Sequence, residues 1–204
     1  MADQHDEPVE VDEVDEEEEP RLDPELAARR AAAMTFIRRY GDPVLKSKAT
    51  PVATFDEALR SQVQRMGGLM HDALGVGLAA PQIGISQRLL VFRVGQDAPL
   101  VALINPEVEW TSKGDEEIAE EGCLSIPGVG VDVERPVHVR VRARDEYGDE
   151  RLVEASGLEA RVIQHEMDHL DGVLILDRTS RDQRKEAIRA LREQERAERE
   201  REAA

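Results

Sequence analysis

The chain has 204 residues, of which 35% are charged, with a formal net charge of −17 and a single cysteine, Cys123, and its length suits one ordinary core with tails. The acidic balance argues against direct binding of DNA or RNA. No apolar run reaches the roughly 18 residues that span a bilayer. The acidic N-terminal residues also differ from the positively charged start of a secretory signal. We therefore expect a cytoplasmic protein with no membrane contact and no specific DNA partner, and one cysteine is compatible with a reducing compartment.

The N-terminal tail is the most acidic part of the chain. Residues 1–24 contain twelve Asp or Glu and one Arg, so they supply −11 of the net charge. Few large apolar side chains are present up to residue 33 to offset the entropy of ordering the chain. We predict that residues 1–33 form a disordered acidic tail that contributes little to the core. A solvating role is favoured over a role in binding a partner.

The body, residues 34–178, begins with a helix and continues with strands. Thr54 and Glu57 have the spacing of a capping box, and apolar residues then recur at helical spacing to Leu74. Short runs rich in β-forming residues follow at 89–94, 100–104, 137–143 and 151–155.

A second helix is predicted near the end of the body. Ser156 and Glu159 repeat the capping box, and the helical pattern continues to Leu170, before Gly172. Because the strands do not alternate regularly with helices, we predict an α+β domain with antiparallel β-sheets packed around this central helix.

Residues 179–204 are expected to form a charged C-terminal helix. From Ser180 onward there are eight basic and seven acidic residues, and pairs such as Arg189 with Glu193 have helical spacing. Ile188 and Leu191 are among its few apolar residues, so only its first half is expected to pack on the body.

The second predicted helix carries an H-E-x-x-H motif at residues 165–169. On a helix this spacing puts His165 and His169 one turn apart on the same face, with Glu166 beside them, which suits two metal ligands and a base. The alternative is a polar helix face with a salt-bridging glutamate. Because Leu158, Val162 and Ile163 make the helix look buried, the metal site is favoured.

A catalytic metal usually has a third protein ligand. Ile175 stands where the longer metzincin motif has its third histidine, and isoleucine cannot bind a metal. Glu186 and Glu193 would suit another protease pattern, but both lie on the charged tail. The remaining candidate is Cys123, which lies in EGCLSIP at residues 121–127. A lone cysteine is usually an inert buried thiol. In a chain that also has the H-E-x-x-H helix, we favour a metal ligand.

A third segment, GVGLAAPQIG at residues 75–84, contains glycines that permit close approach of the backbone to a ligand. Together with EGCLSIP and with QHEMDHLDG at residues 164–172, it resembles the three signature motifs of the peptide deformylases, in the same order. The resemblance covers roughly residues 34–178 and leaves both tails unexplained. It implies a hydrolase that removes the formyl group from the N-terminal methionine of new polypeptides and releases formate.

The resemblance also implies the roles of individual residues. Cys123, His165 and His169 would bind one divalent metal ion, Fe(II) in the first place, with Ni(II), Co(II) or Zn(II) also accepted. Glu166 would take a proton from the attacking water and return it to the departing amine. The Leu124 backbone N–H and the Gln82 side-chain amide would receive the negative charge on the formyl oxygen.

The substrate implied is an N-formylmethionyl nascent peptide lying along the edge of residues 75–77. Gly77 would leave room for the small formyl group. Val76, Leu158 and Val162 are candidates for the methionine pocket, and Arg161 is expected at its mouth.

Three alternatives concern function and partners. A zinc endopeptidase could be built on the same H-E-x-x-H helix, and a non-enzymatic metal-binding module would need neither Glu166 nor Gln82. The basic residues after Ser180 could help the enzyme dock on ribosomal RNA, but the interleaved acidic residues leave this segment a net charge of about +1, so a solvated helix is favoured.

Overall fold

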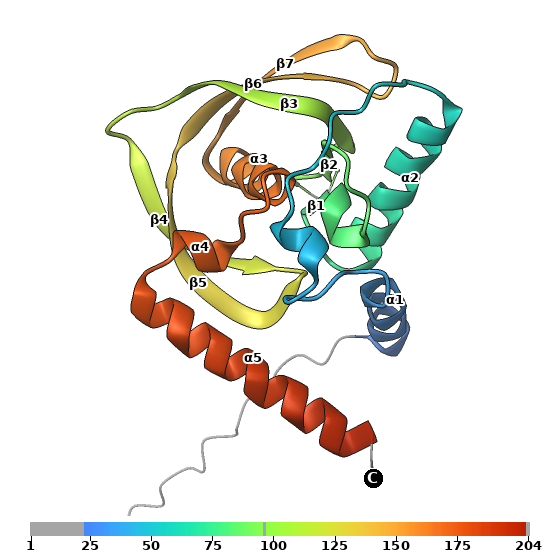
Figure 1. Ribbon diagram of the computed structural model, residues 1–204. Helices are drawn as coiled ribbons and strands as arrows, with labels where there is room; N and C mark the ends of the chain where they lie inside the picture. Colours follow the sequence, from blue (N-terminus) through green and yellow to red (C-terminus); the bar gives the residue numbers. More distant parts are fainter. Residues whose placement is uncertain (1–22, 96, 203–204) are drawn as a thin grey trace, which may run out of the picture.

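The computed structural model describes residues 23–95 and 97–202 (Figure 1). Its helices and strands, in chain order, are α1 Pro24–Met34, the 3-10 helix η1 Pro43–Lys46, α2 Glu57–Asp72, β1 Gly77–Ala79, the 3-10 helix η2 Ala80–Ile83, β2 Leu89–Phe92, β3 Val101–Thr111, β4 Glu116–Cys123, β5 Ile126–Pro136, β6 His138–Arg144, β7 Glu150–Ser156, α3 Gly157–Leu170, α4 Ile175–Arg178 and α5 Arg181–Glu202. None of the helices in these ranges combines the length and apolarity that crossing a bilayer requires.

Two antiparallel sheets surround helix α3. The larger has five strands in the order β1-β2-β3-β6-β7, and β4 and β5 form a two-stranded ribbon. Helix α3 packs against β1, β2 and β7 of the larger sheet and against β5 of the ribbon (Figure 1). Its buried Ile163 and Leu170 join Leu90, Phe92 and Leu103 in one apolar cluster. The predicted α+β class with antiparallel sheets is confirmed.

Helix α2 covers the other side of the β1–β2 region. Its apolar face buries Leu59, Val63, Met66 and Met70, as the spacing predicted. The predicted start was two residues early, because Asp56 and not Thr54 is the N-cap: its carboxylate accepts a hydrogen bond from the Leu59 N–H at 3.0 Å.

The four predicted strands correspond to β2, β3, β6 and β7, but the ribbon β4–β5 and the short β1 were missed. In β5 the buried residues Val129, Val131 and Val133 alternate with exposed ones, which is the pattern of a half-buried strand. The ribbon pairing is regular to Gly122 and shifts register at Cys123, which pairs with Ile126. Cys123 therefore lies where the regular pairing of β4 with β5 ends.

Helix α3 has the predicted bounds, with a different contact at its start. Ser156 is the N-cap residue, but its side chain makes no capping hydrogen bond and instead lies 2.7 Å from His138 Nδ1. Gly172 follows the helix with a φ of 72°, a conformation that favours glycine. An added Cβ there would lie 2.8 Å from the Lys46 carbonyl, so this glycine lets the chain leave α3 close to η1.

The two tails differ from each other in how well they were predicted. Residues 1–22 of the predicted disordered tail lie outside the described residues, but the prediction is wrong for residues 24–33, which form most of α1. Asp23 accepts hydrogen bonds from the Glu25 and Leu26 N–H groups, and the alanine-rich sequence that follows favours a helix. At the other end, the charged helix α5 is confirmed, and Ala187 and Leu191 of its first half are buried with residues of β5.

Candidate metal centre

Three predicted ligands from two elements meet at the end of β4. Helix α3 contributes His165 and His169, and Cys123 is the last residue of β4. One ligand atom of each lies within 4.8 Å of the others, and Cys123 Sγ is 3.3 Å from His169 Nε2. The alternative ligands Glu186 and Glu193 are exposed on α5. The geometry therefore favours Cys123 over both glutamates as the third donor.

The donor set fits a divalent transition metal. His165 Nδ1 lies 2.9 Å from Glu121 Oε2, which fixes the ring and leaves Nε2 as its remaining donor atom. Burial, together with the charges of His165 and Arg135, lowers the pKa of His169 well below its ordinary value, so this imidazole stays neutral. Burial would also lower the pKa of His165, but hydrogen bonds with Cys123 and Glu121 outweigh it and raise that pKa, so this ring must lose a proton when it binds a metal. One thiol and two imidazoles within a few ångström of one another suit several late first-row ions.

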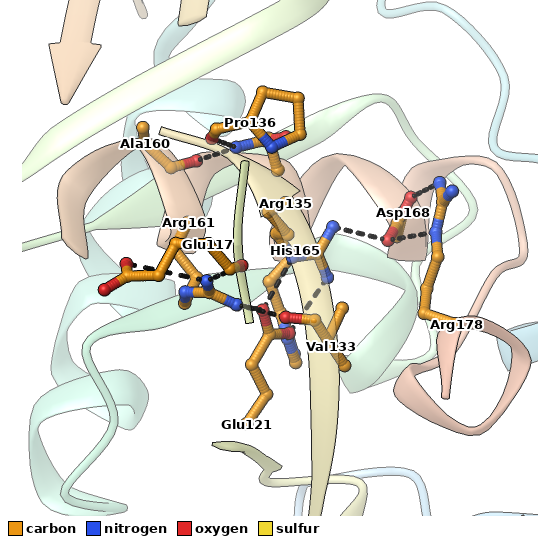
Figure 2. A network of polar contacts seen from close by, with 11 residues as sticks. Glu117, Glu121, Val133, Arg135, Pro136, Ala160, Arg161, His165, Asp168 and Arg178 are labelled. Carbon is orange, nitrogen blue, oxygen red and sulfur yellow. Dashed lines mark hydrogen bonds and ion pairs between the residues drawn. The ribbon is translucent and has the colours of Figure 1, made fainter. Parts of the chain in front are cut away.

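A buried network of charges holds Glu121 and, through it, His165 (Figure 2). Arg135 donates to both oxygens of Glu121 at 2.6 and 2.9 Å and to Asp168 at 2.9 Å. Arg161 also donates to Glu121, and Arg178 pairs with Asp168. Burial alone would raise the pKa of Glu121, but hydrogen bonds from Arg135 and His165 outweigh it and lower that pKa to about 2. A permanently charged carboxylate therefore orients His165.

Sequence reasoning missed this network. Glu121 lies two residues before Cys123, and Asp168 lies inside the H-E-x-x-H motif, so both are close to predicted ligands in the chain. Arg135 is not close to a predicted ligand in the sequence, and only the pairing of β4 with β5 brings it beside Glu121.

Glu166 lies beside the ligands and is almost fully buried, with 4% of its surface exposed. Its Oε2 has no hydrogen-bond partner within the described residues. Burial raises its pKa to about 7, in spite of the nearby His165 and Arg135. A Cβ at Gly77 would lie 2.8 Å from Glu166 Cγ, so a glycine is what lets β1 approach this carboxylate.

Gln82 is held in a defined orientation on η2. Its side-chain oxygen accepts a hydrogen bond from the Ala79 N–H at 2.8 Å, which fixes the amide. Its Nε2 lies 3.4 Å from Ser125 Oγ and 3.7 Å from Cys123 Sγ, so the N–H side faces the candidate metal position. Leu124 directly follows Cys123 in the turn between β4 and β5.

A cavity of about 380 Å³ opens onto these groups. All five predicted substrate-binding residues, Val76, Gly77, Leu158, Arg161 and Val162, line it. Val162 is buried, whereas Val76 and Leu158 are about half exposed and so lie toward its rim. Arg161 was expected at the mouth of the pocket; it lines the cavity but is only 8% exposed, because its guanidinium donates to Glu121 and to the Val133 and Glu117 carbonyls. Two residues of α1, Arg30 and Met34, also line the cavity, which was not predicted from the sequence.

Comparison with known proteins agrees with this arrangement. Residues 34–185 match the family model described as polypeptide deformylase. The chain belongs to the polypeptide deformylase family. It is 52% identical over 145 residues to a peptide deformylase of Thermotoga neapolitana, covering 71% of this chain and 87% of that protein. It is 45% identical over 163 residues to one of Acidothermus cellulolyticus, covering 80% and 88%.

Solved structures of peptide deformylases have the same fold. The enzyme from Legionella pneumophila superposes with a TM-score of 0.75 at 40% identity, over 79% of this chain and 95% of that one. The enzyme from Synechococcus elongatus, in complex with actinonin, has a TM-score of 0.72 at 47% identity, over 76% and 85%.

Family membership confirms the function that the three motifs predicted. The protein is a peptide deformylase, a metalloenzyme that hydrolyses the N-formyl group from the N-terminal methionine of new polypeptides. A zinc endopeptidase and a non-enzymatic metal-binding module are thereby set aside. The matched range excludes most of α1 and of α5.

Proposed function

We propose that Cys123, His165 and His169 bind one divalent metal ion and that Glu166 transfers the protons of deformylation. The observation that supports this most strongly is the meeting of the three donor atoms within 4.8 Å beside a buried carboxylate whose Oε2 has no partner in the described part of the chain. A buried carboxylate oxygen without a partner is costly unless it has a function there.

We further propose Fe(II) as the metal in the cell, with Ni(II), Co(II) and Zn(II) as substitutes that the same donors would accept. When bound, the ion supplies Lewis acidity, which lowers the pKa of water and polarises the formyl oxygen.

Glu166 is placed to carry protons in both halves of the reaction. It accepts a proton from the water that attacks the formyl carbon, and it returns that proton to the methionine nitrogen as the carbon–nitrogen bond breaks. Formate and a free α-amino group are the products. The buried position of Glu166 keeps bulk water from competing for this proton.

Gln82 and Leu124 are proposed to stabilise the negative charge on the formyl oxygen. The Gln82 amide is already oriented by the Ala79 N–H, so its Nε2 donates without reorganisation. The backbone N–H of Leu124 is the second donor.

The cavity is proposed to bind the formyl-methionine. Gly77 is proposed to lie beside the formyl group, because the lack of a side chain at this position lets the backbone of β1 approach Glu166. Val76, Leu158 and Val162 supply apolar surface for the methionine side chain, and Arg161 fixes the wall behind them through Glu121 and Val133.

Formate release from formyl-Met-Ala-Ser, measured anaerobically with Fe(II)-loaded protein, tests these assignments. Glu166→Gln is expected to keep the metal but lose roughly 10²–10⁴ in rate, the usual contribution of a general acid–base group. Glu159→Gln, in the first turn of the same helix and outside the cavity lining, is the control and should keep both. Near-normal turnover by Glu166→Gln would show that another group moves the proton.

A contact between α5 and the ribosome is a second proposal, supported by the exposed basic residues of its first half, where residues 181–192 carry five basic and two acidic side chains. Pairs such as Arg189 with Glu193 offset part of that charge, so the attraction is expected to be weak and salt-sensitive. Replacing the exposed Arg189 and Arg192 by Gln should lower ribosome co-sedimentation without slowing formyl-peptide turnover, and unchanged co-sedimentation would leave α5 a solvated helix.

A further inference from the structure

Helix α1 forms part of the active-site cavity although it lies almost wholly outside the range that matches the family model. The helix packs against α2 of the catalytic domain (Figure 1). Its Ala33 is buried, and Met34 packs on the apolar cluster that contains Leu78 and Val91. The same Met34 and its neighbour one turn earlier, Arg30, line the cavity together with Gly77 and Glu166. A substrate in this cavity therefore meets residues of α1 as well as residues of the matched range.

Most charges of the cavity wall are already engaged. Glu121 and Arg161 bind each other, and His165 and Glu166 belong to the metal centre. The remaining charged residues of the lining are Arg30 on α1 and Glu120 on β4. Within the described ranges, Arg30 has no carboxylate oxygen within 4.0 Å, and its side chain is partly exposed. Because Arg30 lines the cavity, its guanidinium can contact a group that enters there.

We propose that Arg30 makes this deformylase favour peptides with an acidic side chain one or two residues after the formyl-methionine. The inference rests on the deformylase function. A formylated N-terminus carries no charge. The side chains that follow the methionine are therefore the first groups of the substrate that can interact with the charge of Arg30. Arginine binds carboxylates through two parallel hydrogen bonds, which adds orientation to attraction.

The expected size of the preference follows from the exposure of Arg30. Solvent-exposed ion pairs contribute roughly 0.2–1 kcal/mol, which corresponds to about a 1.5- to 5-fold higher kcat/KM for an aspartate than for an asparagine at the same position. Because the pair is exposed to solvent, the preference should shrink as salt shortens the range of the interaction from about 10 Å at 0.1 M to about 3 Å at 1 M. Glu120 carries the opposite charge, so replacing it should strengthen the preference for acid.

The test uses the full-length, metal-loaded enzyme and C-terminally amidated peptides. The series formyl-Met-Xaa-Ser and formyl-Met-Ala-Xaa, with Xaa as Asp, Asn or Lys, gives kcat/KM ratios in which differences in total active enzyme cancel. Wild-type enzyme should favour Asp over Asn and Asn over Lys in at least one series. Arg30→Gln should bring the Asp-to-Asn ratio to about 1, and Arg30→Glu should invert it.

Arg29 supplies the matched control, because it has the same charge on the same helix but is exposed and does not line the cavity. Arg29→Gln and Arg29→Glu should keep the wild-type ratios. Equal changes of the Asp-to-Asn ratio in the Arg29 and Arg30 variants would overturn the proposal, because they would assign the preference to the total charge of α1. An Asp-to-Asn ratio of 1 for the wild-type enzyme at low salt would also overturn it. Failure of the deformylase function itself looks different, because no peptide would then release formate.

Discussion

Replacing Gly77 by alanine is expected to disable the enzyme while leaving its metal in place. The added Cβ would lie 2.8 Å from Cγ and 2.9 Å from Cδ of Glu166, whereas carbon atoms in contact are ordinarily about 3.5–4.0 Å apart. Glu166 must therefore move by roughly 0.5–1 Å, and a displacement of about 1 Å at a catalytic group can cost on the order of 10²-fold in rate. Overpacking of this kind should also lower the free energy of unfolding by about 1–3 kcal/mol.

Three measurements on Gly77→Ala check this reasoning: formate release from formyl-Met-Ala-Ser, metal content after dialysis, and the thermal midpoint. The control is Gly68→Ala on α2, where an added Cβ meets nothing within 4 Å; alanine there should raise stability slightly, by about 0.5–1 kcal/mol, and leave the rate unchanged. A Gly77→Ala enzyme with normal turnover would refute the argument that this glycine sets the position of Glu166. Loss of metal together with activity would place the damage at the ligands.

Other changes have separate expected outcomes. Cys123→Ala should lose its metal on dialysis, because two imidazoles form a weak, exchangeable site; a full equivalent of metal by elemental analysis would remove Cys123 from the ligand set. Arg135→Leu should lower the free energy of unfolding by about 3–5 kcal/mol in urea titrations, because it leaves Glu121 and Asp168 short of a buried partner, and a loss below 1 kcal/mol would count against that role. Burial would raise the pKa of Asp177, but hydrogen bonds from Lys46 and the Leu174 N–H lower that pKa below its ordinary 3.8. The contribution of Asp177 to stability is therefore complete above about pH 4 and is lost as the pH falls through the lowered pKa. Asp177→Asn should therefore reduce the difference in urea midpoint between pH 6 and pH 3, and an unchanged difference would exclude this contribution.

The parts of the fold that could be predicted were those with a strong local pattern. Helix α3 was found because Ser156, the apolar residues of its buried face and Gly172 each indicate helix boundaries or burial. Strand β4 was missed because it is mostly exposed and acidic, with Ile118 on its surface, so it shows no alternation of apolar and polar residues. Strand β5 does alternate, so it could have been predicted from its valines. The stability of β4 comes from its pairing with β5, which is a property of two segments and not of one.

The predicted ligands and Glu166 meet in the structure because the motifs that carry them combine residue types with a demanding spacing. What the sequence could not indicate were the partners that depend on tertiary packing, such as Arg135 behind Glu121. Arg30 illustrates the same limit for the substrate cavity: its alanine- and arginine-rich surroundings resembled a tail, and only the packing of α1 on α2 places it beside the cavity.

The buried charges around Glu121 also have an evolutionary consequence. Each of Glu121, Arg135 and Asp168 depends on at least two charged neighbours, so a single neutral substitution strands the others in an apolar interior. We therefore expect these residues to be replaced in evolution as a set, because a protein with only one of them replaced would be less stable. Paired replacements such as Glu121→Gln with Arg135→Met should accordingly cost less than the sum of the single changes, and drift in this protein should be concentrated on the surfaces of α1 and α5.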